Sequence, residues 1–306
     1  MSAIKISEDN PFQKLIAEAN HDPAQLQSRY ESHRETRNEQ QRTAILRPEF
    51  AGWKLDEILM RLDGPRKEEG YLDPRNCLVI WARPSPAIRD LIAFVQGELK
   101  SVAPSLWTMP DDCLHTTVLE VAHSLTEGEI ENLVQTLQSS EVSTRQISEY
   151  AVAHQTRLLK PLISFDSAAL ALTLVPAAGE GVEASPSGDS DSYSYHHLRR
   201  DIFDITRQAN LPVASRYIVP SAHITIGRFI TDDGFVKGDD GRQVDSAAVK
   251  RFVDKIGEVN DNLKRKYWPS EGGIPDGGEW IVGQEMGLVV RRGRLWYGGG
   301  EDVPLG

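Results

Sequence analysis

Cysteines and long hydrophobic runs are scarce in this sequence of 306 residues. The only cysteines, Cys77 and Cys113, form no CxxC pair and no disulfide framework, so a reducing intracellular compartment is expected. No apolar run approaches the ~20 residues that cross a bilayer, and the opening MSAIKISEDNPF lacks the basic and apolar regions of a signal peptide. We therefore predict a cytoplasmic location, with the nucleus as an alternative, and no membrane partner.

Positive charge is also in short supply. The chain has 34 Lys and Arg against 45 Asp and Glu, which gives a net charge of -11. A protein that holds a long nucleic acid through its phosphates is usually basic over at least one domain. The balance therefore argues against a long duplex and favours a small phosphorylated substrate or the end of an oligonucleotide. The charge balance does not indicate whether the protein is a monomer or an oligomer.

Several catalytic signatures are missing. No Gly-x-Ser-x-Gly occurs, and the glycine-rich stretch EGGIPDGGE lacks the Lys-Ser/Thr of a phosphate-binding loop. His196 and His197 are adjacent, so on a helix they point about 100° apart, and neither has a histidine four residues further on. We therefore predict no metal site and no cofactor.

What the sequence does contain is a repeated tetrapeptide, His-x-Thr-aliphatic, which occurs once as HTTV and once as HITI. Side chains alternate along a β-strand, so His115 shares a face with Thr117, and His223 shares a face with Thr225. With eight histidines in the chain, two chance copies have a probability of roughly 0.004. We interpret the four residues as one site, with two catalytic imidazoles and two hydroxyls that bind a phosphate.

The order of the predicted elements around the two motifs also repeats. Residues 1–70 are predicted to form a helical N-terminal extension, and residues 71–306 one domain. Within that domain we place a lobe with the first motif at about 77–140, a lobe with the second at about 193–297, and a mobile Gly/Ser/Asp-rich loop at about 177–192. Periodicity, caps and turn residues predict strands at 77–84, 113–121 and 216–230, a hairpin at 162–177, and helices at 53–62, 85–102, 126–140, 193–212 and 245–268.

Between about Cys77 and Tyr297, the motifs HTTV and HITIGRF resemble those of the two-histidine (2H) phosphoesterase superfamily, the LigT-like RNA ligases and cyclic nucleotide phosphodiesterases. The first 70 residues, the Ser/Asp-rich loop and the Trp-Tyr-Gly-rich end look like a fungal-type branch of it. The resemblance implies an α+β fold that is bilobal and pseudo-symmetric. Two antiparallel sheets with flanking helices would surround a central cleft, with the helical N-terminal extension added.

The resemblance also implies the chemistry. In such enzymes the histidines, here His115 and His223, act as general base and general acid on a 2′,3′-cyclic phosphate or a related phosphodiester of a nucleotide or RNA end. No metal is required, and Thr117 and Thr225 bind the phosphate. An imidazole has an unperturbed pKa near 6.5, so a pair can hold one neutral and one protonated member at neutral pH. A catalytically silent module that binds a nucleotide or RNA end, and an RNA-end ligase, are the alternatives.

Other side chains are weaker candidates for substrate contacts. Trp81 and Arg83 share one face of the first strand, where they can offer a stacking surface and a charge. Tyr217 precedes the second motif. Strict alternation puts Arg228 on the face opposite His223, which favours a structural role, and the Arg and His residues of the N-terminal extension are predicted to form a solvated face.

Overall fold

The structure is a computed structural model that describes residues 6–181, 191–214, 218–237 and 243–306. Tyr217 and most of the loop predicted at 177–192 lie outside the described residues. The helices are α1 (Gln13–Glu18), α2 (Pro23–Ile45), α3 (Glu57–Leu62), α4 (Pro86–Lys100), α5 (Glu127–Gln138), α6 (Thr144–Ala153), α7 (Tyr195–Gln208) and α8 (Ser246–Tyr267), with a 3-10 turn at Asp111–Cys113. The strands are β1 (Asn76–Ala82), β2 (Trp107–Thr108), β3 (Thr116–Leu125), β4 (Arg157–Phe165), β5 (Ala169–Pro176), β6 (Ala222–Arg228), β7 (Val236–Lys237), β8 (Gln243–Val244), β9 (Glu279–Ile281), β10 (Leu288–Gly293) and β11 (Glu301–Asp302).

Local signals in the sequence begin several of these helices. Thr126 and Glu129 form a capping box at the start of α5, as predicted. At the start of α2 the carboxylate of Asp22 accepts a hydrogen bond from a backbone N–H, and Pro23 occupies the first turn. The helix predicted at 126–140 is confirmed, and in the structure it is slightly shorter, Glu127–Gln138.

The helix predicted at 53–62 is shorter in the structure. Asp56 ends the preceding extended segment, and its Oδ1 accepts a hydrogen bond from the N–H of Leu59, which caps α3. Trp53 lies outside the helix because its ring stacks on Phe229, with centroids 4.1 Å apart. Burial of a large aromatic side chain thus outweighs the helical periodicity at this point.

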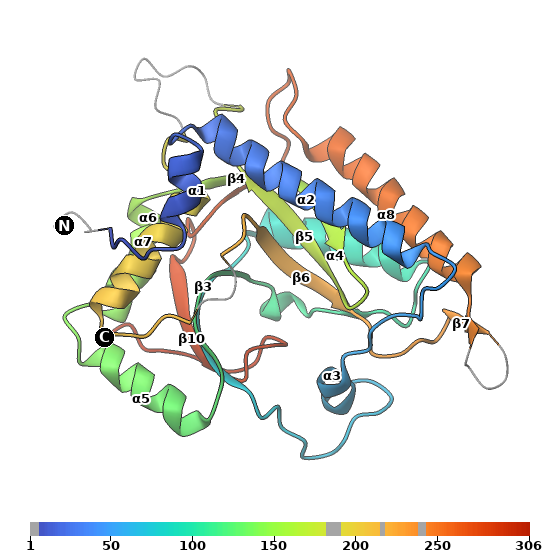
Figure 1. The fold of residues 1–306 in the computed structure, drawn as a ribbon, viewed down its shortest axis with the longest axis horizontal. Coiled ribbons are helices and arrows are strands. Elements are labelled where there is room, and N and C mark those ends of the chain that lie inside the picture. Colours follow the sequence, from blue (N-terminus) through green and yellow to red (C-terminus); the bar gives the residue numbers. More distant parts are fainter. Residues whose placement is uncertain (1–5, 182–190, 215–217, 238–242) are drawn as a thin grey trace.

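The fold is α+β, and all strand pairs in the main sheet are antiparallel. The strand order is β11-β10-β1-β3-β6-β5-β4-β9, with β2 paired to β6. The prediction of two separate sheets needs one amendment: β3 and β6 pair at Thr116 and Ile224, so the motif strands of both halves belong to one nine-stranded sheet. This contact is short because the two halves diverge on either side of it (Figure 1). Strands β7 and β8 form a separate antiparallel pair.

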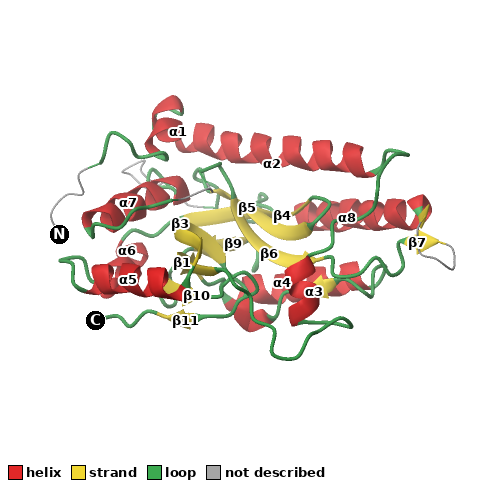
Figure 2. Cartoon of the chain, turned by 60° about the horizontal axis from the view of Figure 1, so that its bottom comes forward, coloured by secondary structure: helices red, strands yellow, loops and turns green. Residues whose placement is uncertain are grey.

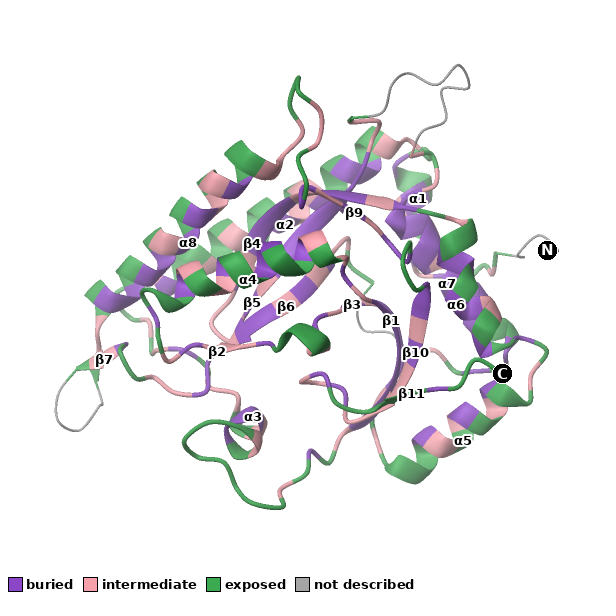
Figure 3. Cartoon of the chain, turned by 180° about the vertical axis from the view of Figure 1, so that it is seen from behind, coloured by how far each residue is buried: buried purple, intermediate pink, exposed green. Residues whose placement is uncertain are grey.

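Helices cover both faces of the half that contains β4, β5 and β6. Helix α2 crosses one face (Figure 2), and α4 and α8 cover the other (Figure 3). Helix α4, which connects β1 to β3, thus packs on the half that carries the second motif. Conversely, α7 leads into β6 but packs against β3. Each motif strand is therefore held by a helix that belongs to the other part of the chain.

The first 70 residues contribute to the same core as the sheet. Phe12, Tyr30, Ile45 and Trp53 are buried in one cluster with side chains of β1, β3, β5 and β6. The boundaries of the extension and of the two lobes stay predictions.

None of the helices in the described ranges is both long and apolar enough to cross a membrane.

Candidate active site

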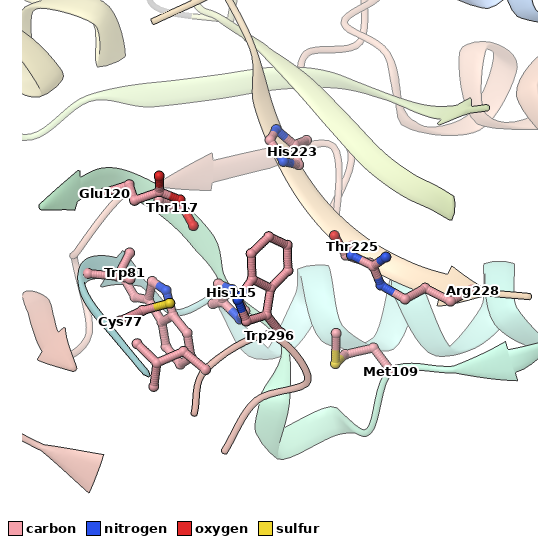
Figure 4. A pocket seen from close by; sticks show the side chains of 12 residues that line it. Cys77, Trp81, Met109, His115, Thr117, Glu120, His223, Thr225, Arg228 and Trp296 are labelled. Atoms are coloured by element: carbon pink, nitrogen blue, oxygen red, sulfur yellow. The ribbon is translucent and has the colours of Figure 1, made fainter. Parts of the chain in front are cut away.

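The four residues of the repeated motif line one pocket of about 90 Å³ (Figure 4). His115 precedes β3, whose second residue is Thr117, while His223 and Thr225 lie on β6. The sequence predicted that each imidazole shares a face with a hydroxyl. The structure brings the two pairs together, from strands that meet at the middle of the sheet.

A single residue between the members of the first pair fixes this meeting point. Thr116 is the register partner of Ile224, and its Oγ1 donates a hydrogen bond to the carbonyl of His223 (2.9 Å). Because Thr116 lies between His115 and Thr117, this contact sets the position of the first motif directly against the backbone of the second. A long-range hydrogen bond of this kind fixes the register of β3 relative to β6.

His115 is held on two sides. Its Nδ1 lies 2.8 Å from the carbonyl of Cys113, which can only accept, so Nδ1 carries the proton and Nε2 is the nitrogen open to proton transfer. The ring stacks on Trp81, with centroids 3.7 Å apart and planes 15° apart. The pKa of His115 is lowered to about 3, chiefly by burial and to a smaller extent by the positive charges of Arg83 and Arg291, while the hydrogen bond to Cys113 acts in the opposite direction.

His223 is also neutral in the unliganded protein. Its Nδ1 lies 3.1 Å from Oγ of Ser221. Burial lowers its pKa to about 4, with smaller contributions from the charges of Arg199 and Arg228. The prediction of one protonated and one neutral imidazole at neutral pH is therefore wrong for the unliganded state, because both rings are desolvated and face cations.

Arg228 corrects the alternation argument. Opposite β5, Thr225 pairs with Ala171 and Gly227 pairs with Leu170, so Ile226 is an extra residue without a partner. This β-bulge shifts the alternation by one, and Arg228 lines the pocket on the same face as Thr225 (Figure 4).

The guanidinium of Arg228 is positioned by an acidic group from the N-terminal part of the chain. Its Nη1 donates to Oδ2 of Asp56 at 3.2 Å, and Asp56 also accepts a hydrogen bond from the hydroxyl of Tyr297 (2.5 Å). The Nε of Arg228 is buried and has no hydrogen-bond partner among the described residues. A buried cationic donor facing the pocket is suited to an anionic ligand.

Glu120 occupies the equivalent place in the first half. Opposite β1, Thr117 pairs with Trp81 and Leu119 pairs with Ile80, so β3 also has an irregularity directly after the threonine. Glu120 consequently lines the pocket with Thr117, and it is only 6% exposed. Its Oε1 lies 3.8 Å from Nε2 of His123. Sequence reasoning missed it, although Glu120 follows Thr117 by the same three residues that separate Arg228 from Thr225.

The three weaker candidates have different outcomes. Trp81 lines the pocket but is 1% exposed, and the face expected to stack a base is occupied by His115. Nη1 of Arg83 donates to the carbonyls of Asp112 and Leu114, both at 3.0 Å. Trp81 and Arg83 therefore support the turn that carries His115 instead of offering a stacking surface. Tyr217 lies outside the described residues.

The C-terminal part of the chain closes one wall of the pocket. Leu295 packs with Cys77, Val79 and Trp81 in a small apolar cluster, and Trp296 lies at the pocket edge. This contact could not be predicted from the sequence, because β10 meets β1 only through the tertiary pairing of distant segments.

The adjacent histidines of α7 make hydrogen bonds with neighbouring hydroxyl groups. Nδ1 of His196 lies 2.8 Å from the hydroxyl of Tyr30, and Nδ1 of His197 lies 3.0 Å from Oγ of Ser194. Within the described ranges, no group of three or more His, Cys, Asp or Glu is arranged to hold a metal ion.

Comparisons with known proteins find similarity at the level of structure only. No family model matches the chain, and no curated protein matches its sequence. A conserved protein of unknown function from Agrobacterium tumefaciens is similar over 79% of this chain and 90% of its own, at 12% identity and a TM-score of 0.44. Usb1 from Kluyveromyces marxianus is similar over 76% of this chain and 99% of its own, at 12% identity and a TM-score of 0.35. Similarity at these values carries no conclusion about family or reaction.

Proposed function

We propose that this protein is a metal-independent phosphodiesterase of the two-histidine class, which hydrolyses a 2′,3′-cyclic phosphate or a related phosphodiester of a nucleotide or RNA end. One observation carries the proposal. His115, Thr117, His223 and Thr225 line a single pocket from two strands that pair at its centre. Two imidazoles and two hydroxyls around one space are suited to a phosphate that needs a proton donor and a proton acceptor.

In the proposed reaction, one imidazole removes a proton from water as the water oxygen forms a bond to phosphorus. The bond from phosphorus to one ribose oxygen breaks, and the second imidazole, protonated, gives its proton to that oxygen. The product is a phosphate monoester, and one water is consumed. The hydroxyls of Thr117 and Thr225 and the guanidinium of Arg228 donate to the non-bridging oxygens, where negative charge increases.

The low pKa values of the two histidines determine when the general acid is protonated in the proposed reaction. Both imidazoles are neutral at pH 7 without ligand, so the acid must acquire its proton when the substrate binds. The negative charge of a phosphate between the rings favours the protonated form and raises the pKa of the ring beside it. Substrate binding is thus proposed to take up a proton.

The test is turnover of a panel of 2′,3′-cyclic mononucleotides, RNA ends with a cyclic phosphate and ADP-ribose cyclic phosphate. His115→Asn and His223→Asn should each lower kcat by roughly 10²–10⁴, the usual contribution of a positioned acid or base. Thr117→Val and Thr225→Val should lower it less, because each removes one neutral hydrogen bond. His21→Asn is the matched control, because His21 is exposed and does not line the pocket.

Three outcomes would contradict the proposal. A silent binding module would bind the cyclic phosphates without forming product, and an RNA-end ligase would join ends in place of hydrolysing them. Near wild-type turnover by either His→Asn variant would show that the paired mechanism is wrong. Membership of the 2H superfamily is part of the proposal. Its fungal-type branch and the cytoplasmic location stay predictions from the sequence.

A further inference from the structure

A second hollow adjoins the catalytic pocket below helix α2. This hollow, the α2 groove, has a volume of about 460 Å³ and is lined by residues of α2, β5 and β6. Figure 2 shows how α2 runs across these strands. Four residues line both spaces: His223, Thr225, Arg228 and Trp296. A ligand whose phosphate lies between the histidines can therefore extend into the α2 groove past shared side chains. The volume is in the range of pockets that hold ligands of nucleotide size.

The floor of the α2 groove is open because its side chains are small. Along β5, Ala169, Ala171 and Thr173 face the groove. Leu172, which lies between Ala171 and Thr173, is buried in the core on the other face, which α4 and α8 cover. Larger side chains on the groove face would fill the space below α2. The strand thus combines a packed core on one side with an open channel on the other.

One stripe of α2 forms the wall. His33, Arg34, Arg37 and Asn38 line the groove, and their spacing puts them on one side of the helix. These residues were predicted to be a solvated face, and the structure instead directs them toward the extended site. Arg37 is exposed and makes no hydrogen bond or ion pair with the described part of the chain. Its charge is available to a ligand.

The charge of the groove is opposite to that of the whole protein. Arg34 is 5% exposed, and its Nε and Nη2 are buried without a hydrogen-bond partner among the described residues, while its guanidinium lies 5.5 Å from the centroid of the Trp268 ring. Asp166 is the one carboxylate among the described residues that line the groove, and its Oδ1 accepts hydrogen bonds from the N–H groups of Ala168 and Ala169. With Arg34, Arg37 and Arg228 around it, the groove is positive although the chain carries a net charge of -11. Such a channel concentrates anions.

We propose that the α2 groove binds the nucleotides that precede the reacting phosphate at the 3′ end of a single-stranded RNA. The inference rests on the proposed function. A ribose with a 2′,3′-cyclic phosphate has only its 5′ oxygen left for attachment, so any further nucleotides of the RNA must precede it. Each of these nucleotides adds one negative phosphate, which Arg37 and its neighbours on α2 can contact. A cyclic mononucleotide carries only the reacting phosphate, so it has no further phosphate for Arg37 and its neighbours on α2 to contact. The protein therefore acts on RNA ends in preference to free cyclic nucleotides.

The experiment compares two substrates, adenosine 2′,3′-cyclic phosphate and a single-stranded RNA of a few nucleotides that ends in the same group. The 306-residue protein should have a higher kcat/KM for the RNA. Arg37→Glu should lower kcat/KM for the RNA by roughly 10-fold, through KM, and leave the mononucleotide unchanged. The slope of log affinity against log salt for the RNA should fall by about 0.7 for the lost phosphate contact. Arg42→Glu is the matched control, because Arg42 is exposed on the same helix and does not line the groove.

The outcomes separate the two proposals. Equal effects of Arg37→Glu on both substrates, or equal effects of Arg37→Glu and Arg42→Glu on the RNA, would overturn the groove assignment. If His115→Asn and His223→Asn abolish turnover while Arg37→Glu changes nothing, the phosphodiesterase stands and the groove does not. If those histidine variants keep full turnover, the proposed function fails whatever the result at Arg37.

Discussion

The indole of Trp81 lies flat against the imidazole of His115, with ring centroids 3.7 Å apart. Trp81 is fully buried on β1 and is the register partner of Thr117, so the strand next to the first motif also supplies the surface that orients its histidine. The carbonyl of Cys113 holds the ring at Nδ1. Stacking and hydrogen bond together leave the imidazole one orientation, with Nε2 as the nitrogen for proton transfer.

We expect Trp81→Leu to lower kcat by roughly 10-fold with little change in KM, because Trp81 positions His115 and does not bind the substrate. Water that enters beside the smaller side chain should raise the pKa of His115 toward its ordinary value, since burial is the largest cause of its low pKa. The pH profile of kcat/KM and titration of the ring by NMR measure this shift. Trp81→Phe keeps a stacking face and should retain most of the activity. An unchanged pKa of His115 in Trp81→Leu would contradict this role.

A second prediction concerns Arg228. Arg228→Gln should lower kcat/KM by roughly 10², the loss expected for a charged donor that faces the reacting phosphate. It should also raise the pKa of His223, because the positive charge of Arg228 lowers that pKa in the wild type. Arg61→Gln is a control, since Arg61 forms an exposed ion pair with Glu68. A loss of activity without movement of the pH profile would mean that Arg228 acts only on the fold.

Chelation supplies a third prediction. Turnover should survive prolonged treatment with excess EDTA, because two imidazoles carry the proposed proton transfers and Arg228 with two hydroxyls meets the phosphate charge. Activity is compared before and after dialysis against the chelator, with protein concentration and melting temperature measured in parallel. Loss of turnover that zinc or manganese restores would show that the histidines have been assigned the wrong roles.

The buried histidines predict a loss of stability in mild acid. The pKa values of His115, His196, His197 and His223 are lowered by burial to between about 3 and about 4. Between pH 6.5 and these values the unfolded chain binds protons that the folded protein does not, so the free energy of unfolding rises with pH there and falls on acidification. Each such histidine contributes a slope of about 1.4 kcal/mol per pH unit at most.

The measurement is urea unfolding at several pH values between 5 and 6.5. The double variant His115→Asn/His223→Asn should show a smaller slope than the wild type, by up to two protons, because two of the four groups are gone. Identical slopes would mean that the catalytic imidazoles titrate normally in the folded protein, and the proposed uptake of a proton on binding would then be unnecessary.

Much of the local structure could be predicted from the sequence. The capping box at Thr126, the turn between β4 and β5 and the strands around both motifs follow from residue type and periodicity, which act over a few neighbouring residues. Helix α6 received no prediction, and the helix predicted from Trp53 begins only after Asp56. At α6 the local signal is present, since Oγ of Ser143 accepts a hydrogen bond from the N–H of Gln146 and caps the helix. Before α3, burial of the Trp53 ring outweighs small differences in helix propensity.

By itself the sequence determined that His115 is paired with Thr117 and His223 with Thr225, because alternation along an extended chain puts residues two apart on one face. It could not determine that Thr116 binds the backbone of His223, since those residues are 107 positions apart. Nor could it locate the two β-bulges that turn Glu120 and Arg228 into the pocket, because a bulge is defined by the register of the partner strand. The tertiary structure alone decided these contacts and the low pKa values of both imidazoles, which arise from desolvation once the strands, α2 and the C-terminal wall have packed together.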